Sequence, residues 1–441
     1  MTPPTAQIAA GLQGYDPEAL RAADVGAFLD RLVQPVAGTQ DIGLFDALGR
    51  VLARDVVSPI SVPPHDNSAM DGYAFAGAQR VAGQPLMLRV VGKALAGTAW
   101  SGTVAQGECI KIMTGAVMPP GLDTVVPQEL TTATQDGRIA IAADVPLRVG
   151  ANRRLKGEDL MQGRVALARG EPLTPAALGL LASLGLQSVT VFRRLRVAYF
   201  STGDEILSLG EPPREGAVYD SNRHAVRGLL ARLGVEVIDL GVVRDDPALL
   251  EAALRDAAAR ADAIVTSGGV SAGEADHTRT MMKKLGDVAF WRIAMRPGRP
   301  MAVGRIQAKS ASSACPSSAG SYENSSILFG LPGNPVAVMV TFLAFVRPAL
   351  LRMMGSTRPA PPLLRAVAAS PLRKKPGRTE YQRGIVTAEP DGTLRVRTTG
   401  NQGSGVLSSM VHANGLIVLG HDQGDVAAGD AVDVMLFDGA I

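Results

Sequence analysis

The chain has 441 residues, more than one hydrophobic core usually supports, so roughly three domains of about 150 residues each are expected. Apolar residues make up 46% of the sequence, which excludes a largely disordered protein. Only 4% of the residues are aromatic and the net charge is +3, so a nucleic-acid partner is not expected.

The sequence also lacks the usual signals for membranes and metal thiolates. The N-terminal residues contain no basic segment followed by an apolar one, so no secretory signal is predicted. The apolar run 336–346 is too short to cross a bilayer. Cys109 and Cys315 have no CxxC or His-spaced partners, which argues against a disulfide scaffold or a thiolate zinc site. We therefore expect a cytoplasmic protein that does not bind membranes.

The first half of the chain alternates between segments with helical periodicity and segments with short β-like runs. Residues 22–55 read as mainly helical, and prolines then end this pattern. Residues 61–155 carry short β-like runs separated by Gly and Pro, and 173–185 return to helical periodicity. We expect 22–60 and 156–192 to form a discontinuous, helical or mixed connecting domain, with a β-rich domain inserted at 61–155.

The second half shows a clearer alternation of strands and helices. Strands are predicted at 196–200, 235–240 and 263–266, with helices at 222–233, 247–260 and 277–285. Such alternation predicts a parallel α/β sheet with right-handed crossovers, here within 193–356. A Ser- and Ala-rich tract at 306–326, which contains Cys315, is predicted to be a mobile loop. Residues 357–441 are predicted to form a small β-barrel-like domain.

Acidic side chains follow the predicted strands of the α/β domain. Because parallel strands deliver their loops to one edge of the sheet, these side chains should converge there. They are Asp204, Glu205, Asp245, Asp246, Glu274 and Asp276. Carboxylates of this kind can hold a divalent cation, and we expect Glu205, Asp245, Glu274 and Asp276 to do so.

The segment SGGVSAGEAD (267–276) has two interpretations. It is either a glycine turn before a helix cap, or a loop whose backbone N–H groups approach a phosphate or oxyanion. In the second interpretation Ser267, Gly268, Gly269 and Ser271 bind the ligand. No GxxxxGK[ST] motif is present, which excludes a P-loop nucleotidase.

Three other polar segments are candidates for binding. WRIAMRPGRP (291–300) carries clustered arginines, which are more often solvated, although guanidinium groups suit bidentate oxyanion binding. NRRLKGED (152–159) is either a salt-bridged hinge or a binding cluster. PPHDNSAMDGYAF (63–75) places Asp66 and Asp71 around a turn; alone, it could be an ordinary capped turn.

Taken together, nine segments in order resemble the molybdopterin molybdenumtransferase family, the MoeA-type enzymes of molybdenum cofactor synthesis that include the gephyrin E domain. The segments are DNSAMDGYAF (66–75), IMTGAVMPPG (112–121), NRRLKGED (152–159), STGDEI (201–206), DSNR (220–223), SGGVSAGEAD (267–276), RPGRP (296–300), GLPGNP (330–335) and NQGSG (401–405).

The resemblance implies an elongated homodimer whose active cleft includes the partner subunit. It also implies that adenylylated molybdopterin and molybdate are substrates, that a divalent cation, usually magnesium, supports hydrolysis with release of AMP, and that molybdenum passes to the dithiolene sulfurs. Candidate partners are a molybdopterin adenylyltransferase and molybdoenzyme-maturation proteins.

The resemblance also assigns site residues by motif position. The implied catalytic residues are Asp66, Asp71, Asp159, Glu205, Asp245 and Asp276. The implied substrate-binding residues are Ser68, Thr114, Arg154, Ser201, Thr202, Gly203, Ser267, Gly268, Gly269, Ser271, Arg292, Arg296, Pro332, Gly333, Asn334, Pro335 and Ser404. Arg292 and Arg296 stand where the family often has lysine, which changes donor geometry.

Two alternative functions remain open at this point. An enzyme that adenylylates molybdopterin with ATP would use a similar α/β domain, but its loop is expected to read GGTG rather than GGVS (268–271). A non-catalytic scaffold related to the gephyrin E domain is the other alternative. If the enzyme is elongated, Asp66, Ser68 and Asp71 are expected to complete the site of the other protomer.

Overall fold

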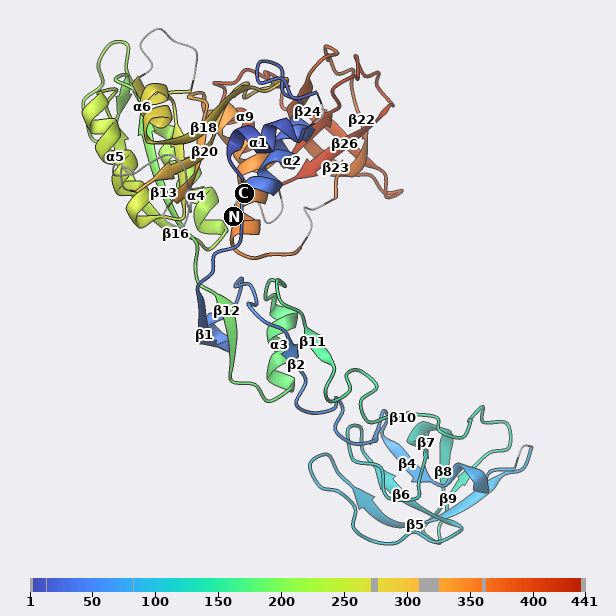
Figure 1. Cartoon of the computed structure of the whole chain (residues 1–441). Coiled ribbons are helices and arrows are strands. Elements are labelled where there is room, and N and C mark those ends of the chain that lie inside the picture. Colours follow the sequence, from blue (N-terminus) through green and yellow to red (C-terminus); the bar gives the residue numbers. More distant parts are fainter. Residues whose placement is uncertain are drawn as a thin grey trace.

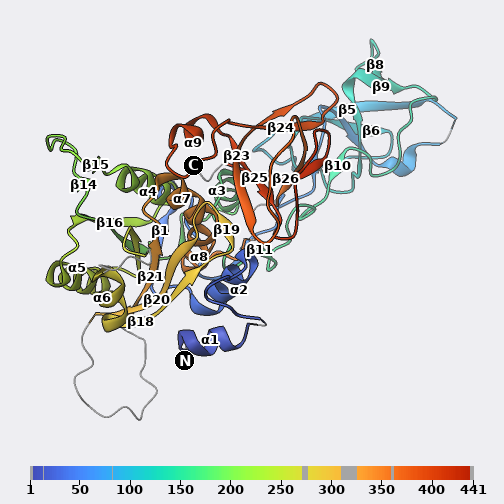
Figure 2. The ribbon, with the colours of Figure 1, turned by 90° about the horizontal axis from the view of Figure 1, so that it is seen from above.

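The computed structural model describes residues 3–12, 14–81, 83–270, 277–308, 325–358 and 362–437. The molecule is elongated (Figure 1). An α/β domain and a C-terminal β domain lie at one end, a small connecting domain lies in the middle, and a β-rich domain lies at the far end. Seen from above, the C-terminal strands stand beside the α/β domain (Figure 2).

The α/β domain is built on a six-stranded sheet of order β16-β13-β17-β21-β20-β18. The strands are β13 Arg196–Thr202, β16 Glu236–Val243, β17 Ala263–Ser267, β18 Gly286–Arg292, β20 Pro300–Gln307 and β21 Ser325–Leu331. The first four in the order are parallel, as predicted, whereas β20 runs antiparallel to both of its neighbours. The prediction of a parallel sheet is therefore wrong at this edge, because β18 returns to β20 without the helical crossover that parallel pairing needs.

Three helices of this domain lie within a residue of the positions that the periodicity predicts: α4 Ser221–Arg232, α5 Pro247–Arg260 and α6 His277–Leu285. The domain also contains α7 Pro335–Thr341, the π-helical turn η4 Phe342–Val346 and α8 Arg347–Met353. Side chains of Asp220 and Asp246 accept backbone N–H bonds at the starts of α4 and α5. The run Pro335–Met353 is the one described helix long and apolar enough to cross a membrane, and 72% of its most apolar stretch is buried inside the fold. It is a core helix of this domain.

The N-terminal helices belong to the α/β domain and not to the connecting domain. α1 (Thr5–Ala10) and α2 (Ala22–Leu32) both join its core. Phe28 of α2 meets Trp291 of β18 edge to face at 4.8 Å, and Arg305 donates to the carbonyl of Leu32 (2.9 Å). The predictions that 22–55 is mainly helical and that the connecting domain begins at residue 22 are therefore wrong. Periodicity identifies the apolar face of α2 but not the sheet that covers it.

The connecting domain is formed by two antiparallel ribbons and one helix. Its elements are β1 Thr39–Gly43, η1 Leu44–Asp46, β2 Val56–Val57, β11 Val165–Leu167, α3 Pro175–Ser183 and β12 Ser188–Phe192. β1 pairs with β12, and β2 pairs with β11. Both ribbons join segments on either side of the inserted domain, so the chain passes out to the β-rich domain and returns alongside itself.

The inserted domain contains a six-stranded sheet of order β7-β4-β6-β5-β9-β8. This agrees with the β-rich domain that the short β-like runs predict. Its elements are β4 Gly72–Phe75, η2 Gly77–Gln79, β5 Leu86–Ala94, β6 Glu108–Ile112, β7 Thr124–Pro127, η3 Gln128–Leu130, β8 Thr131–Ala133 and β9 Arg138–Ile141. A separate two-stranded ribbon, β3 (Asn67–Ser68) with β10 (Arg153–Arg154), lies at its base.

The C-terminal domain is a closed five-stranded barrel. Its strands are β22 Leu364–Ala368, β23 Thr379–Ala388, β24 Leu394–Thr398, β25 Gly415–Leu419 and β26 Ala431–Leu436, with α9 Ser408–His412 between β24 and β25. Closure follows because β23 pairs with both β24 and β25. β19 (Met295–Arg296) pairs with β23 and so joins this barrel to the α/β domain. The short pair β14 Ile206–Leu207 and β15 Val218–Tyr219 projects from the α/β domain.

Candidate functional site

The carboxyl ends of three neighbouring parallel strands form the centre of the site. The register pairs Ser201 with Ser267, and Ser267 with Leu331. The loops after β13, β17 and β21 therefore lie side by side, as the sequence predicts. This edge brings together the predicted binding residues Ser201, Thr202, Gly203, Ser267, Gly268, Gly269, Pro332, Gly333, Asn334 and Pro335. Ser271 lies outside the described residues.

The glycines after β17 allow the loop to pass very close to its neighbours. Gly268 and Gly269 have φ angles of +91° and +64°. A Cβ atom on Gly268 would lie 2.3 Å from the backbone oxygen of Thr202, and the Gly268 N–H donates to the carbonyl of Leu331 (3.1 Å). Such a loop can present backbone N–H groups to an anion only if these positions have no side chain.

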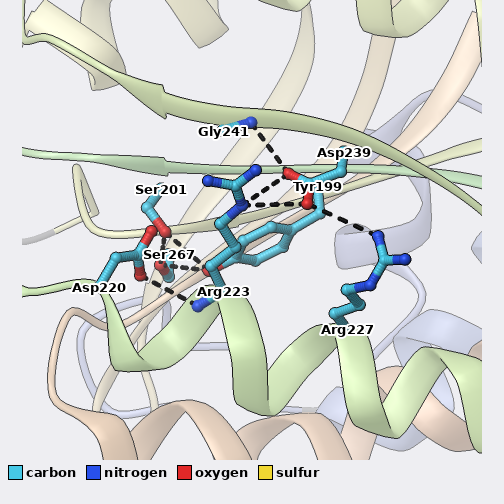
Figure 3. Close-up of polar contacts among 8 residues, drawn as sticks. All are labelled: Tyr199, Ser201, Asp220, Arg223, Arg227, Asp239, Gly241 and Ser267. Carbon is cyan, nitrogen blue, oxygen red and sulfur yellow. Dashed lines mark hydrogen bonds and ion pairs between the residues drawn. The ribbon is translucent and has the colours of Figure 1, made fainter. Parts of the chain in front are cut away.

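A cluster of hydroxyl groups is buried directly beneath these loops. The Tyr199 hydroxyl lies 2.9 Å from Ser201 Oγ and 2.8 Å from Ser267 Oγ, and the two serine oxygens are 3.2 Å apart (Figure 3). Burial raises the pKa of the Tyr199 phenol well above its ordinary value, so the group stays neutral. The cluster fixes the ends of β13 and β17 relative to each other. Sequence reasoning missed Tyr199, since a tyrosine in a strand usually indicates only packing.

The N-terminus of α4 adds two polar side chains with unused acceptors. Asp220 is 4% exposed; its Oδ1 accepts the N–H of Arg223 (3.0 Å), whereas its Oδ2 has no partner. In Figure 3 this carboxylate lies beside Ser201 and Ser267. Asn222 donates to the carbonyl of Gly333 (2.7 Å) and leaves its Oδ1 unpaired. The DSNR segment was noted in the sequence, but only its capping role could be inferred from it.

Ion pairs hold α4 on the sheet. Arg223 Nε lies 2.9 and 3.0 Å from the two carboxylate oxygens of Asp239 on β16, and Arg227 approaches the same carboxylate at 3.7 Å (Figure 3). The Gly241 N–H also donates to Asp239 (3.0 Å). Asp239 therefore fixes the helix whose first turn borders the loops.

The predicted acidic cluster is only partly assembled within the described residues. The Asp245 N–H donates to Asp204 Oδ1 (3.2 Å), so the loops after β13 and β16 do meet. Asp246 caps α5 instead of facing a ligand. The Glu205 side chain folds back over Gly203. A Cβ atom on Gly203 would lie 2.6 Å from Glu205 Oε2. Glu274 and Asp276 lie outside the described residues, and within those described no three His, Cys, Asp or Glu groups are placed to hold a metal ion.

An arginine-lined cavity opens between the α/β domain and the barrel. It has a volume of about 230 Å³, and it is lined by Arg296, Arg373, Glu380, Tyr381, Arg383 and Gln402, among others. Arg383 is 1% exposed and donates to Ser409 Oγ (3.0 Å) and to the carbonyl of Gly403 (3.0 Å). Burial, and then repulsion by Arg296, lower the pKa of Arg383 to about 10. Of these, only Arg296 was predicted, because a buried arginine within a strand carries no local signal.

This cavity connects with the sheet edge through backbone contacts. The carbonyl of Ser404 accepts the N–H of Val336 at the start of α7 (3.1 Å), directly after the 332–335 turn. Ser404 is thus placed between the cavity and the loops; its predicted role in substrate binding stays a prediction. Arg292 lies apart from this cavity, mostly exposed, and forms an ion pair with Glu18 (3.6 Å).

The acidic signature of the inserted domain forms a second, separate group. The Asp66 carboxylate accepts the N–H of Lys156 (2.7 Å) and lies 3.6 Å from Arg153. Asp71 accepts both the N–H and the hydroxyl of Thr114 (2.7 Å each), and these bonds lower the pKa of Asp71, the backbone bond most.

Other predicted residues surround this group. The Ser68 hydroxyl donates to the carbonyl of Met70 (2.6 Å). Arg154 pairs with Asn67 in the β3–β10 ribbon, so its neighbour Arg153 is the arginine that meets Asp66. Asp159 is exposed in the adjoining turn, where its N–H donates to Val62 (3.1 Å). Within one chain, this group and the sheet edge lie in the domains at opposite ends of the molecule (Figure 1).

Comparison with protein families gives matches along most of the chain. Residues 18–185 match the MoeA N-terminal region (domain I and II), residues 198–352 match a probable molybdopterin binding domain, and residues 365–437 match the MoeA C-terminal region (domain IV).

Individual relatives agree with these matches. The chain is 40% identical to a molybdopterin molybdenumtransferase of Haemophilus influenzae over 90% of this chain and 94% of the relative. It is 37% identical to molybdopterin molybdenumtransferase 2 of Mycobacterium tuberculosis, over 89% of this chain and 94% of the relative. The crystal structure of a molybdopterin biosynthesis moeA protein from Pyrococcus horikoshii OT3 superimposes with a TM-score of 0.78 at 26% identity, covering 95% of this chain and all of that one.

Proposed function

The chain belongs to the MoeA family of molybdopterin molybdenumtransferases, and from this membership we propose that it transfers molybdenum from molybdate to molybdopterin. The proposed substrate is adenylylated molybdopterin, whose phosphoanhydride is hydrolysed with release of AMP. The observation that carries this proposal is the convergence of the glycine loops after β13 and β17 with an arginine-lined cavity at the barrel. The relatives are named as molybdenumtransferases, so neither adenylylation with ATP nor a scaffolding role is favoured.

Each part of this region suits one part of the reaction. The loop that begins at Gly268–Gly269 suits the binding of the substrate's phosphate groups by backbone N–H groups, apart from the Gly268 N–H, which is bonded to Leu331. The guanidinium groups of Arg296 and Arg383 favour molybdate, which is a tetrahedral oxyanion. The bond from the Val336 N–H to the Ser404 carbonyl links the segment after the 332–335 turn to the segment beside the cavity, which supports binding of both reactants near this junction.

Magnesium is the proposed cation, with Glu205 and Asp245 as ligands from the described residues and Glu274 and Asp276 as the others. Carboxylate oxygens are the hard ligands that magnesium takes, which fits the chemistry of these residues. When bound, the cation would neutralise charge on the phosphoanhydride and lower the pKa of water.

Release of AMP tests this function directly. Purified protein is incubated with adenylylated molybdopterin, molybdate and magnesium, and AMP is quantified by chromatography. We expect release by the wild type and a loss of at least about 10²-fold in Asp245→Asn. Asp256→Asn is the matched control, because Asp256 lies on the surface of α5 and, among the residues that the structure describes, forms its ion pair with Arg260. No release by the wild type, or equal release by both variants, would contradict the proposal.

The proposed assembly is a homodimer in which Asp66, Ser68 and Asp71 complete the site of the partner. Their position at the far end of the chain from the sheet edge supports this arrangement. Mixing Asp66→Ala and Asp245→Asn subunits should restore about a quarter of wild-type activity, because half of the dimers are mixed and each has one intact site. Absence of recovery would place the signature and the edge in the same subunit's site.

The reaction also has an expected setting. We place it in the cytoplasm, where the buried free thiol of Cys109 stays reduced. A molybdopterin adenylyltransferase would supply the substrate, and molybdoenzyme-maturation proteins would take the product.

A further inference from the structure

A second arginine-rich cavity lies where the connecting domain joins the α/β domain. Its volume is about 170 Å³. Its walls come from residues 48–51 on the connecting side, from residues 192–195 at and after the end of β12, and from residues 231–234 at and after the end of α4. Met354 completes the lining. None of these residues was expected to bind a ligand, and none lines the cavity at the barrel.

Four arginines line this cavity, and most of their charge is not neutralised. Arg193 forms a two-pronged ion pair with Asp262 (2.6 and 2.7 Å). Arg50, Arg194 and Arg232 form no ion pair within 4.0 Å among the residues that the structure describes. The polar partners of the first two are neutral. Arg50 donates to the carbonyl of Phe192 (2.8 Å) and to the side-chain amide oxygen of Gln40 (3.0 Å), and Arg194 donates to the carbonyl of Gly234 (2.8 Å).

Burial makes the position of Arg50 costly, whereas Arg194 and Arg232 are exposed. Arg50 is 7% exposed, and a buried charge is destabilising unless an opposite charge or strong hydrogen bonds compensate it. Burial, and then the charge of Arg194, lower the pKa of Arg50. Arg50 and Arg194 are near enough to repel each other, so both would be stabilised by an anion that accepts hydrogen bonds from the two guanidinium groups, as sulfate and phosphate do.

We propose that this cavity binds a free tetrahedral oxyanion of the size of sulfate or phosphate. The guanidinium groups of Arg50, Arg194 and Arg232 supply the positive charge, and Arg193 is held aside by Asp262. Because its walls come from both domains, a bound anion holds the connecting domain and the α/β domain together at the hinge between them. The site is independent of the proposed transferase activity.

Sulfate is the probe for this site, and the test variant is the double substitution Arg194→Gln with Arg232→Gln. Sulfate binding is measured by titration calorimetry, and the thermal midpoint is followed as sulfate replaces chloride at constant ionic strength. Sulfate can also bind beside Arg296 and Arg383, so the titration is made with saturating molybdate present. We expect the wild type then to bind one sulfate at the junction of the two domains, and the double variant to bind it at least about tenfold more weakly. The sulfate-dependent rise of the midpoint should shrink accordingly.

Two further measurements separate binding from structure. Arg148→Gln with Arg164→Gln is the matched control, since both arginines are exposed on other parts of the surface; it should keep wild-type sulfate affinity. Without sulfate, Arg194→Gln with Arg232→Gln should be at least as stable as the wild type, because repulsion with Arg50 is reduced. Unchanged sulfate affinity in that variant, or a fall in its midpoint that sulfate does not alter, would overturn the proposal.

Discussion

The sheet edge and the acidic signature of the inserted domain both place polar groups at a proposed site, but they are held in opposite ways. At the edge, Tyr199, Ser201 and Ser267 are almost completely buried and come from two strands of the central sheet. In the signature, Asp66 and Asp71 remain accessible and are held by backbone N–H groups of nearby loops. The edge is therefore fixed by the whole α/β fold, and the signature by a few local hydrogen bonds.

The same difference appears in the pKa values. Burial raises the pKa of Tyr199, which keeps its hydroxyl protonated. Donated hydrogen bonds lower the pKa of Asp71, which keeps its carboxylate charged. Substitutions at the edge should therefore alter folding and activity together, whereas substitutions of the accessible Asp66 and Asp71 should alter activity with little effect on folding.

The largest effect is expected for Gly268→Ala, as a loss of AMP release. The new methyl group would stand 2.3 Å from the Thr202 carbonyl in a backbone conformation that L residues avoid, so the loop must move. We expect AMP release to fall about 10²-fold, because misplacement by about 1 Å can have that effect. Gly228→Ala, in the open interior of α4, is the control and should raise the free energy of unfolding by up to about 1 kcal/mol. Wild-type activity in Gly268→Ala would show that the edge is not fixed as described.

Tyr199→Phe should give the next largest effect. It removes the hydroxyl group that is hydrogen-bonded to both Ser201 and Ser267, which lowers the free energy of unfolding by about 1–2 kcal/mol. Denaturant unfolding measures this loss. Tyr73→Phe is the matched control in the inserted domain, where no hydrogen bond to the hydroxyl is recorded among the described residues, and it should change stability by less than about 0.5 kcal/mol. An equal loss of stability in Tyr199→Phe and Tyr73→Phe would show that the hydroxyl cluster does not stabilise the sheet edge.

Ser68→Ala measures a local hydrogen bond inside the signature. Its hydroxyl donates to the Met70 carbonyl in a buried turn, so the expected loss is about 1 kcal/mol. Ser183→Ala on the exposed side of α3 is the comparison and should change stability by less than about 0.5 kcal/mol. A larger loss in Ser68→Ala than in Tyr199→Phe would reverse the ranking of the two regions.

The smallest effect on stability is expected for Asp71→Asn, and this effect depends on pH. Because the folded-state pKa of Asp71 lies below its unfolded value of about 3.9, the carboxylate contributes stability above that value and loses it as the pH falls through the folded-state pKa. The stability difference between wild type and variant should thus be constant at neutral pH and disappear in acid. Thr114→Val removes only the hydroxyl bond, so an NMR titration should show the pKa of Asp71 partly restored. A difference that persists in acid would contradict this account.

Local signals in the sequence predicted much of the α/β domain. The helices 221–232, 247–260 and 277–285 follow from apolar periodicity, whereas the capping role of Asp246 at the start of the second was found only in the structure. The convergence of Ser201 with Ser267 follows from the alternation of strands and helices, because parallel strands end at one edge.

Other features depended on packing between distant segments, and the sequence could not supply them. α2 is amphipathic, but periodicity does not identify the sheet that covers its apolar face. The sequence does not predict β1 as a strand, because its partner, β12, lies on the far side of the inserted domain. Arg383 and Arg50 gain their roles only from burial beside other arginines.

The sequence by itself determined the family, the order of the elements and the loops that gather at the sheet edge, since these depend on motifs and local periodicity. Only the tertiary structure decided which charges are buried, which acceptors lack partners, and how far the signature lies from the edge. The physical reason is that desolvation and repulsion depend on all neighbours of a group, and most of those neighbours are distant in the chain.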